Sequence, residues 1–421
     1  MRLTRREVLA AGAGMALAPL VGCGKTSFGK PVLRVANWSG AVEENDFNAK
    51  IRELYDKFAK DHNCDLQIEG IPGSQEYARK MLLNYVAGSQ PDIMVLDASS
   101  AASFIDNGIL GDLTPFIDKD RTFSLDSFFT NVVDIARRGD SLYAIPNGFT
   151  PMVMYYNQRL FHEAGVPLPK DGWSFADFLQ TAQALTGEKH GFKFASWMPG
   201  WIMWLWNNGG DVLSPDGRTA AGFLDSDKSV EAVEFIRDLV LKHKVAPSLS
   251  QVAAMGVDPF ANGTAAMEVS GHWSLTMYPN GPVITLEDVG VVSLPTNLPQ
   301  SQTVMYETGM AMAKNCRHPE LAWEFIKFWT SDKVQRTYNS TGIEICGRKD
   351  IAEEYGKGPQ RGKFLEIVPT ARAPWGATVQ GYDFVEAEGQ KTMDDILKQG
   401  ADVRASLQQM ARRVDAFFAE Q

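Results

Sequence analysis

The first folded part of the chain alternates short apolar segments with amphipathic ones, and this alternation constrains the fold more than any other feature. The short segments have the pattern of strands, and the longer ones carry apolar residues at helical spacing. Strands are predicted at residues 32–36, 65–69 and 91–97, and helices at 48–62, 75–87 and 98–107. This β-α-β-α-β-α order predicts a parallel sheet that is covered by helices.

Five side chains with ligand-binding chemistry follow the predicted strands. In open α/β sheets a ligand binds beyond the carboxyl ends of the strands. The residues in these positions are Trp38, Ser74, Gln75, Asp97 and Ser99. We therefore expect them to lie at one edge of the sheet, next to a binding site.

Two further apolar segments are predicted to connect two lobes. Residues 144–157 form a strand that proline and glycine interrupt, and residues 303–313 form a strand that runs back. Another buried strand is predicted at 263–269, and one long helix at 391–419. Ser174 begins a helix with Asp177 three residues later, a spacing close to that of a capping box.

The N-terminus has the pattern of an export signal. Arg5 and Arg6 precede an apolar stretch, residues 8–22, which is too short to span about 30 Å of hydrocarbon as a helix. The segment resembles a twin-arginine lipoprotein signal, with a small residue before Cys23. We expect residues 1–22 to be cleaved, Cys23 to be lipidated and residues 23–30 to form a tether. An uncleaved anchor and a chance cysteine are the alternatives.

Charge and cysteine content limit the partners. The formal net charge of −10 argues against binding to nucleic acid and against electrostatic docking onto an anionic membrane. The spacing of Cys64, Cys316 and Cys346 matches no metal motif, so no metal and no cofactor are expected. Three free thiols are the favoured interpretation, and a Cys316–Cys346 disulfide is the alternative in an exported protein.

A series of short motifs runs in order over nearly the whole chain behind the signal. They include Pro91-Asp92-Ile93, Leu142-Tyr143-Ala144-Ile145-Pro146, Tyr155-Tyr156-Asn157, Asn208-Gly209-Gly210 and Gly271-His272-Trp273. Each motif is weak alone. Their order and spacing resemble the extracellular solute-binding proteins of ABC importers, specifically the sugar-binding group, family 1, that includes maltose-binding protein.

The resemblance implies a two-lobed α/β fold, the periplasmic-binding-protein fold of type II. Each lobe would be a mainly parallel sheet flanked by helices, with the ligand in a cleft between the lobes. Lobe I would comprise residues 31–149 and 306–350, and lobe II residues 150–305 and 351–421. The resemblance also implies a monomer outside the cytoplasm that closes on a sugar by a hinge motion, delivers it to a membrane permease and performs no chemistry on it.

Aromatic candidates for the site are expected to cover the apolar face of a sugar ring. Trp273 follows a predicted strand where the family commonly places such a ring, and Trp375 lies near a late aromatic contact of the family. Trp38 ends the first strand. Trp201 and Trp204 are three residues apart and could share a helical face, although a buried core position is as plausible for each. Core positions are expected for Trp173, Trp323 and Trp329.

Polar candidates are needed because sugar hydroxyls must be paired once water leaves the site. Besides Asp97 and Ser99, they lie at the two crossings and beside the Gly-Gly turn: Asn147, Thr150, Asn208, Asp211, Glu307 and Thr308. Glu307 could accept hydrogen bonds from hydroxyls or an amine, or it could form a salt bridge at the hinge.

Three other functions stay open at this stage. A glycoside hydrolase needs two carboxylates that flank one bond, and Asp97 with Glu307 is the pair to nominate. A binding protein for a polyamine or an iron complex is the second alternative, and adjacent Tyr155 and Tyr156 superficially resemble those of iron binders. A sensor that presents its ligand to a receptor would use the same fold.

Overall fold

The alternating N-terminal segments form the parallel sheet that their order predicts. The computed structural model describes residues 29–37, 46–71, 73–278, 283–340 and 342–421. Strand β1 (Val32–Asn37) lies between β2 (Asp65–Gly70) and β3 (Ile93–Asp97) and is parallel to both. Helices α1 (Asp46–Asp61) and α2 (Ser74–Val86) connect these strands, which confirms the β-α-β-α-β prediction.

The two predicted crossing segments are neighbouring strands that complete this sheet. Strand β6 (Ala144–Pro151) pairs antiparallel with β10 (Thr303–Met312), and β10 pairs antiparallel with β3, with Thr308 opposite Asp97. The short strand β11 (Ile345–Cys346) pairs with β6. The main strand order is β11-β6-β10-β3-β1-β2, and along this path only the pairs of β1 are parallel. The short strand β12 (Ala371–Arg372) pairs parallel with β10 beside this path.

The second sheet is antiparallel, so the expectation of a mainly parallel sheet in each lobe is wrong for it. Strand β7 (Val153–Asn157) lies between β8 (Met267–Ser270) and β9 (Val289–Val292) and is antiparallel to both. The reason is the strand order β8-β7-β9: β8 and β9 run in the same direction, but β7 lies between them and runs in the opposite direction. The predicted strand 263–269 begins only at Met267, because the backbone N–H groups of Thr264 and Ala265 donate to the carbonyl of Pro259 in a turn.

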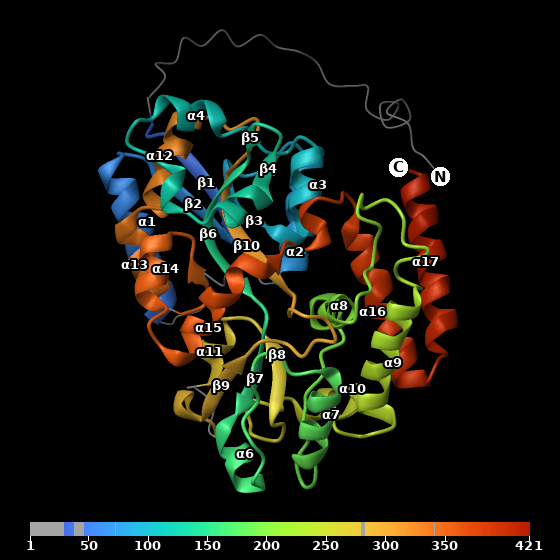
Figure 1. Cartoon of the computed structure of the whole chain (residues 1–421). Helices are drawn as coiled ribbons and strands as arrows, with labels where there is room; N and C mark the ends of the chain where they lie inside the picture. Colours follow the sequence, from blue (N-terminus) through green and yellow to red (C-terminus); the bar gives the residue numbers. More distant parts are fainter. Residues whose placement is uncertain (1–28, 38–45, 72, 279–282, 341) are drawn as a thin grey trace.

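Each sheet belongs to its own hydrophobic core. One core joins apolar residues from 33–145 with residues from 310–334, around the larger sheet, and we call this part lobe I. Another core joins residues from 152–304 with residues from 382–414, around the smaller sheet and its helices, and we call this part lobe II. Strands β6 and β10 run between the two parts (Figure 1), and a smaller third core surrounds them.

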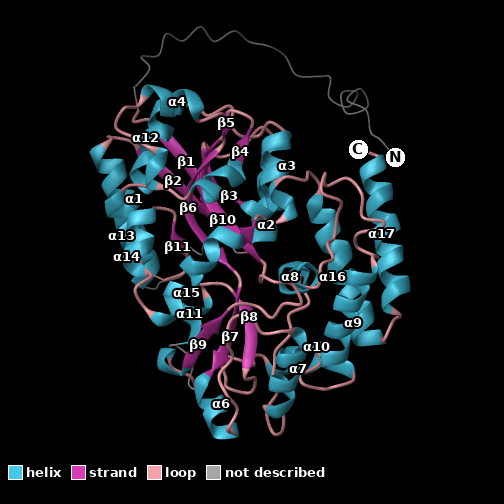
Figure 2. Ribbon diagram, viewed as in Figure 1, coloured by secondary structure: helices cyan, strands magenta, loops and turns pink. Residues whose placement is uncertain are grey.

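The helical layer of lobe II contains α8 (Met198–Asn207), α9 (Asp227–Leu241), α16 (Tyr382–Gln399) and α17 (Val403–Ala419), which Figure 2 shows on one side of the strands. The prediction of one helix at 391–419 is wrong. Gly400 adopts φ 70, which favours glycine and ends α16, and the side chain of Asp402 caps α17. In α7 (Phe175–Ala184) the predicted capping box between Ser174 and Asp177 is confirmed.

The remaining elements complete the two lobes. The helices are α3 (Ala101–Asp106), α4 (Thr114–Lys119), α5 (Thr130–Val133), α6 (Gln158–Ala164), α10 (Leu249–Met255), α11 (Ser274–Met277), α12 (Pro319–Trp329), α13 (Asp332–Asn339), α14 (Lys349–Tyr355) and α15 (Pro359–Ile367). The strands are β4 (Arg137–Arg138), β5 (Ser141–Leu142) and β12 (Ala371–Arg372). Within the described ranges, no helix combines the length and the apolar character needed to cross a bilayer.

The cysteines of the described part of the chain are free thiols. Cys64 and Cys346 are buried and Cys316 is partly exposed. The alternative of a Cys316–Cys346 disulfide is therefore wrong, and the favoured interpretation of three free thiols is confirmed. The predicted signal peptide 1–22, Cys23 and most of the tether lie outside the described residues.

Candidate functional site

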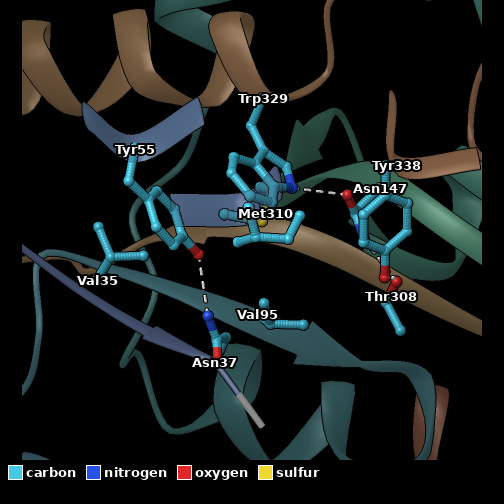
Figure 3. Close-up of a pocket in the computed structure, with 10 residues that line it drawn as sticks. Val35, Asn37, Tyr55, Val95, Asn147, Thr308, Met310, Trp329 and Tyr338 are labelled. Carbon is cyan, nitrogen blue, oxygen red and sulfur yellow. Dashed lines mark hydrogen bonds between the residues drawn. The ribbon is translucent and has the colours of Figure 1, made fainter. Parts of the chain in front are cut away.

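A small cavity lies where β1, β3, β6 and β10 meet α1, α12 and α13 (Figure 3). Its volume is about 40 Å³, which is room for a few water molecules and far below the roughly 300–1,000 Å³ of small-molecule sites. A sugar would enter only if the surrounding parts moved apart. The lining residues are Val35, Asn37, Ile51, Tyr55, Val95, Asn147, Thr308, Met310, Trp329 and Tyr338.

Aromatic rings and side-chain amides hold one another in this cavity. The indole N–H of Trp329 donates to Asn147 Oδ1 at 2.7 Å, and the amide of Asn37 donates to the Tyr55 hydroxyl oxygen at 3.0 Å. The rings of Tyr55 and Trp329 stack with centroids 5.0 Å apart. The sequence predicts Trp329 as a core residue. It belongs to the lobe I core and also forms a wall of the cavity.

A buried carboxyl group adjoins the cavity wall. The Thr308 hydroxyl donates to Glu344 Oε2 at 2.8 Å, and the Tyr338 hydroxyl donates to the same oxygen at 3.3 Å. Burial, and then the charge of Asp97, raise the pKa of Glu344 to about 7. A Cβ at Gly148 would overlap this carboxyl, so glycine is required there for close packing.

Asp97 ends β3, as predicted, and it engages Ser99. The Ser99 backbone N–H donates to Asp97 Oδ1 at 2.7 Å, and the Ser99 hydroxyl donates to the same oxygen. Burial raises the pKa of Asp97, although both hydrogen bonds lower it. The second oxygen of Asp97 remains available, whereas the Ser99 hydroxyl proton is already used.

Glu307 lies in β10 beside Thr308 and is completely buried. Neither carboxylate oxygen has a hydrogen-bond partner among the described residues. Burial raises its pKa well above the ordinary value, and Asp97 and Glu344 raise it further. The predicted hinge salt bridge is not formed: in the part of the chain that the structure describes, no basic side chain pairs with Glu307. A buried carboxyl without a partner costs free energy, so this group is poised to accept a donor.

One face of α16, in lobe II, carries further polar side chains. Tyr382, Glu386 and Gln390 are spaced four residues apart and share this face. Burial, and then Asp97, raise the pKa of Glu386 to about 8. The Tyr382 hydroxyl is buried and has no hydrogen-bond partner in the described structure. Gln390 donates to Ser196 Oγ at 2.8 Å, just before α8 begins.

Asp211 organises a second aromatic group. It accepts hydrogen bonds from the indole N–H groups of Trp206 and Trp375, each at 2.8 Å, and pairs with Arg372 at 2.8 Å. The Arg372 guanidinium also lies over the Trp206 ring, 4.0 Å from its centroid. Asp211 is thus a positioning residue, while Trp375 remains partly exposed.

Trp273 lies just after β8 and is partly exposed. Its ring folds back over Gly271, where a Cβ would overlap the indole. The carbonyl of Gly271 accepts a hydrogen bond from the Tyr155 hydroxyl at 2.8 Å. Backbone and ring therefore fix each other, which keeps one side of the indole available for stacking.

Four predicted ligand contacts are structural instead. Trp201 and Trp204 are 0% and 1% exposed in the core of lobe II, which agrees with the alternative expectation of a core position for both. Four phenylalanine rings contact Trp204: Phe175, Phe178, Phe192 and Phe235. Thr150 accepts from the backbone N–H of His272 and donates to the carbonyl of Pro151. The Asn208 side-chain amide donates hydrogen bonds to the carbonyl of Lys228 and to Glu231, and its oxygen accepts one from Asn297. Their hydrogen-bonding atoms or ring faces are already occupied.

Three other predicted contacts are not tested by the structure. Trp38 lies outside the described residues. Ser74 and Gln75 begin α2, as predicted, but their side chains are not described. All three stay predictions.

Sequence reasoning missed several polar and aromatic side chains. Glu344 and Glu386 follow no predicted strand, so no local pattern marks them. Tyr306 sits one residue before Glu307 and packs against the core of lobe II, and burial, followed by the charge of Glu386, raises its pKa. Trp197 is 42% exposed immediately before α8. Pro199, which favours a helix start, was the signal that separates Trp197 from the buried tryptophans of the helix.

The site residues do not form a metal centre. Among the residues that the structure describes, no three His, Cys, Asp or Glu side chains converge as metal ligands would. Tyr155 is fully buried and donates to a backbone carbonyl, which argues against the pair of iron ligands considered from the sequence.

Comparison with known proteins points to one family. The sequence model described as bacterial extracellular solute-binding protein matches residues 41–336. The chain is 21% identical to a binding protein of Brucella abortus over 93% of this chain and 97% of that protein. It is 20% identical to the galactooligosaccharide-binding protein of Bacillus subtilis over 74% of this chain and 73% of that one.

A solved structure has the same fold. The ABC substrate-binding protein of Listeria monocytogenes in complex with cycloalternan superposes with a TM-score of 0.83 at 21% identity. The match covers 93% of this chain and 99% of that chain. At this identity the likeness establishes the two-lobed fold.

Proposed function

The chain belongs to the bacterial extracellular solute-binding proteins, and from this premise we propose that it is the substrate-binding protein of an ABC importer for a carbohydrate. It would bind a mono- or oligosaccharide between its lobes and deliver it unchanged to the membrane permease. The names of the relatives, which include galactooligosaccharide-binding and cycloalternan-bound proteins, support this ligand class.

The observation that carries the proposal is the arrangement of aromatic rings and polar groups around the crossing strands. Trp273 and Trp375 are partly exposed and held by backbone or carboxylate contacts, as stacking platforms for sugar rings need to be. Asp97, Asn147 and Thr308 lie on the paired strands β3, β6 and β10. Asp97 offers its second carboxylate oxygen to a hydroxyl group where the two lobes join. Asn147 accepts from Trp329 and Gln335, and Thr308 donates to Glu344, so these two residues fix the wall beside it.

Ligand binding would act through hinge closure. The division into lobe I (31–149 and 306–350) and lobe II (150–305 and 351–421) remains a proposal, and the separate cores of the two parts support it. A ligand that contacts both lobes stabilises the closed arrangement. The strands β6 and β10 are the elements that must bend.

A binding role fits the carboxyl groups better than hydrolysis does. A glycosidase requires one carboxylic acid and one carboxylate that both reach the scissile bond. In this structure Glu307 is sealed from solvent, and Asp97 already accepts two hydrogen bonds from Ser99. Absence of hydrolysis of chromogenic glycosides is therefore expected.

The proposed location is outside the cytoplasm, as for other members of the family. Twin-arginine export and lipidation of Cys23 are part of the proposal and depend on the sequence of the N-terminus alone. One acyl chain would bind a membrane only marginally, so durable anchoring needs more than one. A monomer that docks onto the permease is proposed as the working form.

A ligand screen tests the proposed function. Mono- and disaccharides are added to the mature protein and the melting temperature is recorded, because a ligand at 100 times its Kd adds about 2.7 kcal/mol of stability. At least one sugar is expected to raise the melting temperature and to reduce the radius of gyration in small-angle scattering. If no sugar does so while a polyamine or ferric complex does, the carbohydrate assignment is wrong.

A further inference from the structure

Four acidic side chains gather where the two lobes meet, and we call them the carboxylate cluster: Asp97, Glu307, Glu344 and Glu386. Asp97 lies opposite Thr308, which is bonded to Glu344 and adjacent to Glu307 in the chain. The charge of Asp97 raises the pKa of each of the other three, after the effect of burial. The four groups come from four separate segments of the chain. Strand pairing and the Thr308–Glu344 hydrogen bond bring Asp97 and Glu344 together, and α16, which carries Glu386, packs against residues 98–100 directly after Asp97.

No cation of the described structure neutralises this cluster. None of the four carboxylates forms an ion pair with a lysine, arginine or histidine that the structure describes. Arg372, whose charge reaches the neighbouring Tyr382, is already paired with Asp211 and lies over the ring of Trp206. Carboxylates taken from water without a counter-ion are costly, because like charges repel and their hydration is lost.

Two buried polar groups at the cluster lack partners. Both oxygens of Glu307 are unpartnered in the described structure at 0% exposure, and so is the hydroxyl of Tyr382 at 1% exposure. The Tyr382 hydroxyl lies in the field of Glu386, which raises its pKa after burial does. A buried carboxyl and a buried hydroxyl on different lobes therefore both await a donor or acceptor.

The surroundings favour an organic cation over a metal ion. Among the described residues, no three of these carboxyl groups converge as the ligands of a metal ion would. Aromatic rings accompany them: Tyr306 and Tyr382 interact with Glu386, and Trp375 is held by Asp211 nearby. Carboxylates beside aromatic faces are suited to an ammonium group on a larger apolar body.

We propose that the site takes a carbohydrate that bears a protonated amine, with the ammonium group among the carboxylates of the cluster and the ring against the aromatic side chains. This inference rests on the proposed carbohydrate-binding function and narrows its ligand class. A neutral sugar would form hydrogen bonds at the cluster, whereas an ammonium group would also stabilise the ionised form of its carboxyl groups.

Matched sugars test the inference by isothermal titration calorimetry at about pH 7. The probes are glucosamine, galactosamine and mannosamine, their N-acetyl forms, and the corresponding neutral sugars. We expect at least one amine to bind about tenfold more tightly than its N-acetyl and neutral counterparts. The N-acetyl form keeps the ring and the nitrogen but removes the charge.

Variants assign the effect to the cluster. Glu386→Gln removes one partly exposed carboxylate and should weaken binding of the amino sugar about tenfold, with the neutral sugar changed less than about twofold. Glu353→Gln is the control, because Glu353 is an exposed carboxylate on α14, and it should change neither affinity. Melting temperatures without ligand confirm that both variants are folded.

The outcomes separate this inference from the proposed function. Equal affinities for amino and neutral sugars would overturn the inference and leave carbohydrate binding intact. Binding of a linear diamine such as putrescine in preference to every sugar would overturn both. Binding of none of these monosaccharides would overturn the inference alone, because the proposed function also allows an oligosaccharide. Loss of amino-sugar affinity in Glu353→Gln to the same extent as in Glu386→Gln would remove the cluster from the explanation.

Discussion

The carboxylate of Asp211 holds the indole of Trp375, because Asp211 Oδ1 accepts the Trp375 N–H at 2.8 Å. The same carboxylate accepts the N–H of Trp206 and pairs with Arg372. A residue of the loop after α8 therefore positions a ring from the C-terminal part of the chain. Trp375, which is proposed to stack on the ligand, is therefore held in position by its hydrogen bond to the Asp211 carboxylate.

Removal of this anchor should affect stability and affinity together. Asp211→Ala leaves two indole N–H groups and Arg372 without their acceptor, and we expect a loss of about 2 kcal/mol in the free energy of unfolding, since Asp211 is only partly buried. Sugar affinity should fall as Trp375 becomes mobile. Urea unfolding and calorimetry measure the two effects, with Glu353→Ala as the control. An unchanged unfolding midpoint would mean that packing alone holds Trp375.

Gly271 and Trp273 should behave as one unit. In Gly271→Ala the new methyl group would overlap the indole and displace it. Trp273→Ala should weaken sugar binding by about 1–3 kcal/mol, and Gly271→Ala should reproduce much of that loss. The double variant should be little worse than Trp273→Ala, because the second change has no ring left to displace.

A control substitution is available for this pair. Gly187→Ala adds a methyl group where no atom lies within 4 Å, so it should leave affinity unchanged. Full sugar affinity in Trp273→Ala would assign that ring to packing and would contradict its proposed role.

Glu344 should make stability depend on pH. Its pKa is raised from 4.5 to about 7 by burial, so folding favours the protonated form. The stability from this group is fully present below about pH 4.5 and is lost as pH rises through about 7, a change of about 3 kcal/mol. Glu344→Gln stays neutral and can still accept from Thr308 and Tyr338. It should therefore be more stable than the wild type at pH 8 and similar at pH 4.5.

Urea unfolding at the two pH values measures this difference. Titration of Glu386 changes the free energy of unfolding of the wild type and of the variant by the same amount. The difference between the two proteins therefore reports on Glu344. The exposed Glu353→Gln variant keeps Glu344 and should therefore match the wild type at both pH values. An equal stability of Glu344→Gln and wild type at pH 8 would indicate that the carboxyl is charged in the folded protein at little cost.

Cys23 is expected to anchor the protein. Cys23→Ala should release the protein from the membrane fraction, because the acylated thiol is lost. Immunoblots of membrane and soluble fractions after a carbonate wash measure this, with Cys64→Ala as the control. Retention of Cys23→Ala in the washed membranes would contradict lipidation.

Local patterns predicted those parts of the fold that depend on neighbouring residues. The parallel strands β1, β2 and β3, the crossing strands and the capping box at Ser174 are all confirmed. The antiparallel order β8-β7-β9 was missed, because strand pairing depends on residues far apart in the sequence. The break at Gly400 was overlooked although its signal, a glycine followed by a capping aspartate, was present.

The site shows the same division. The sequence predicted Asp97 at the end of the third strand and Thr308 in the second crossing strand, because both strands are visible as local patterns. It did not predict that the two residues lie opposite each other. Trp204 and Trp273 could not be told apart by their neighbours. The rings that pack around Trp204 come from three different segments of the chain, and only their assembly buries it.

The sequence by itself determined the periodicity of strands and helices, the family and the position of polar residues at strand ends, because these depend on short stretches of chain. Only the tertiary structure decided which tryptophans are buried and which carboxylates gather without a cation. Burial and electrostatic interaction are properties of atoms close in space, and Asp97, Glu307, Glu344 and Glu386 become neighbours only when the two lobes fold around β6 and β10.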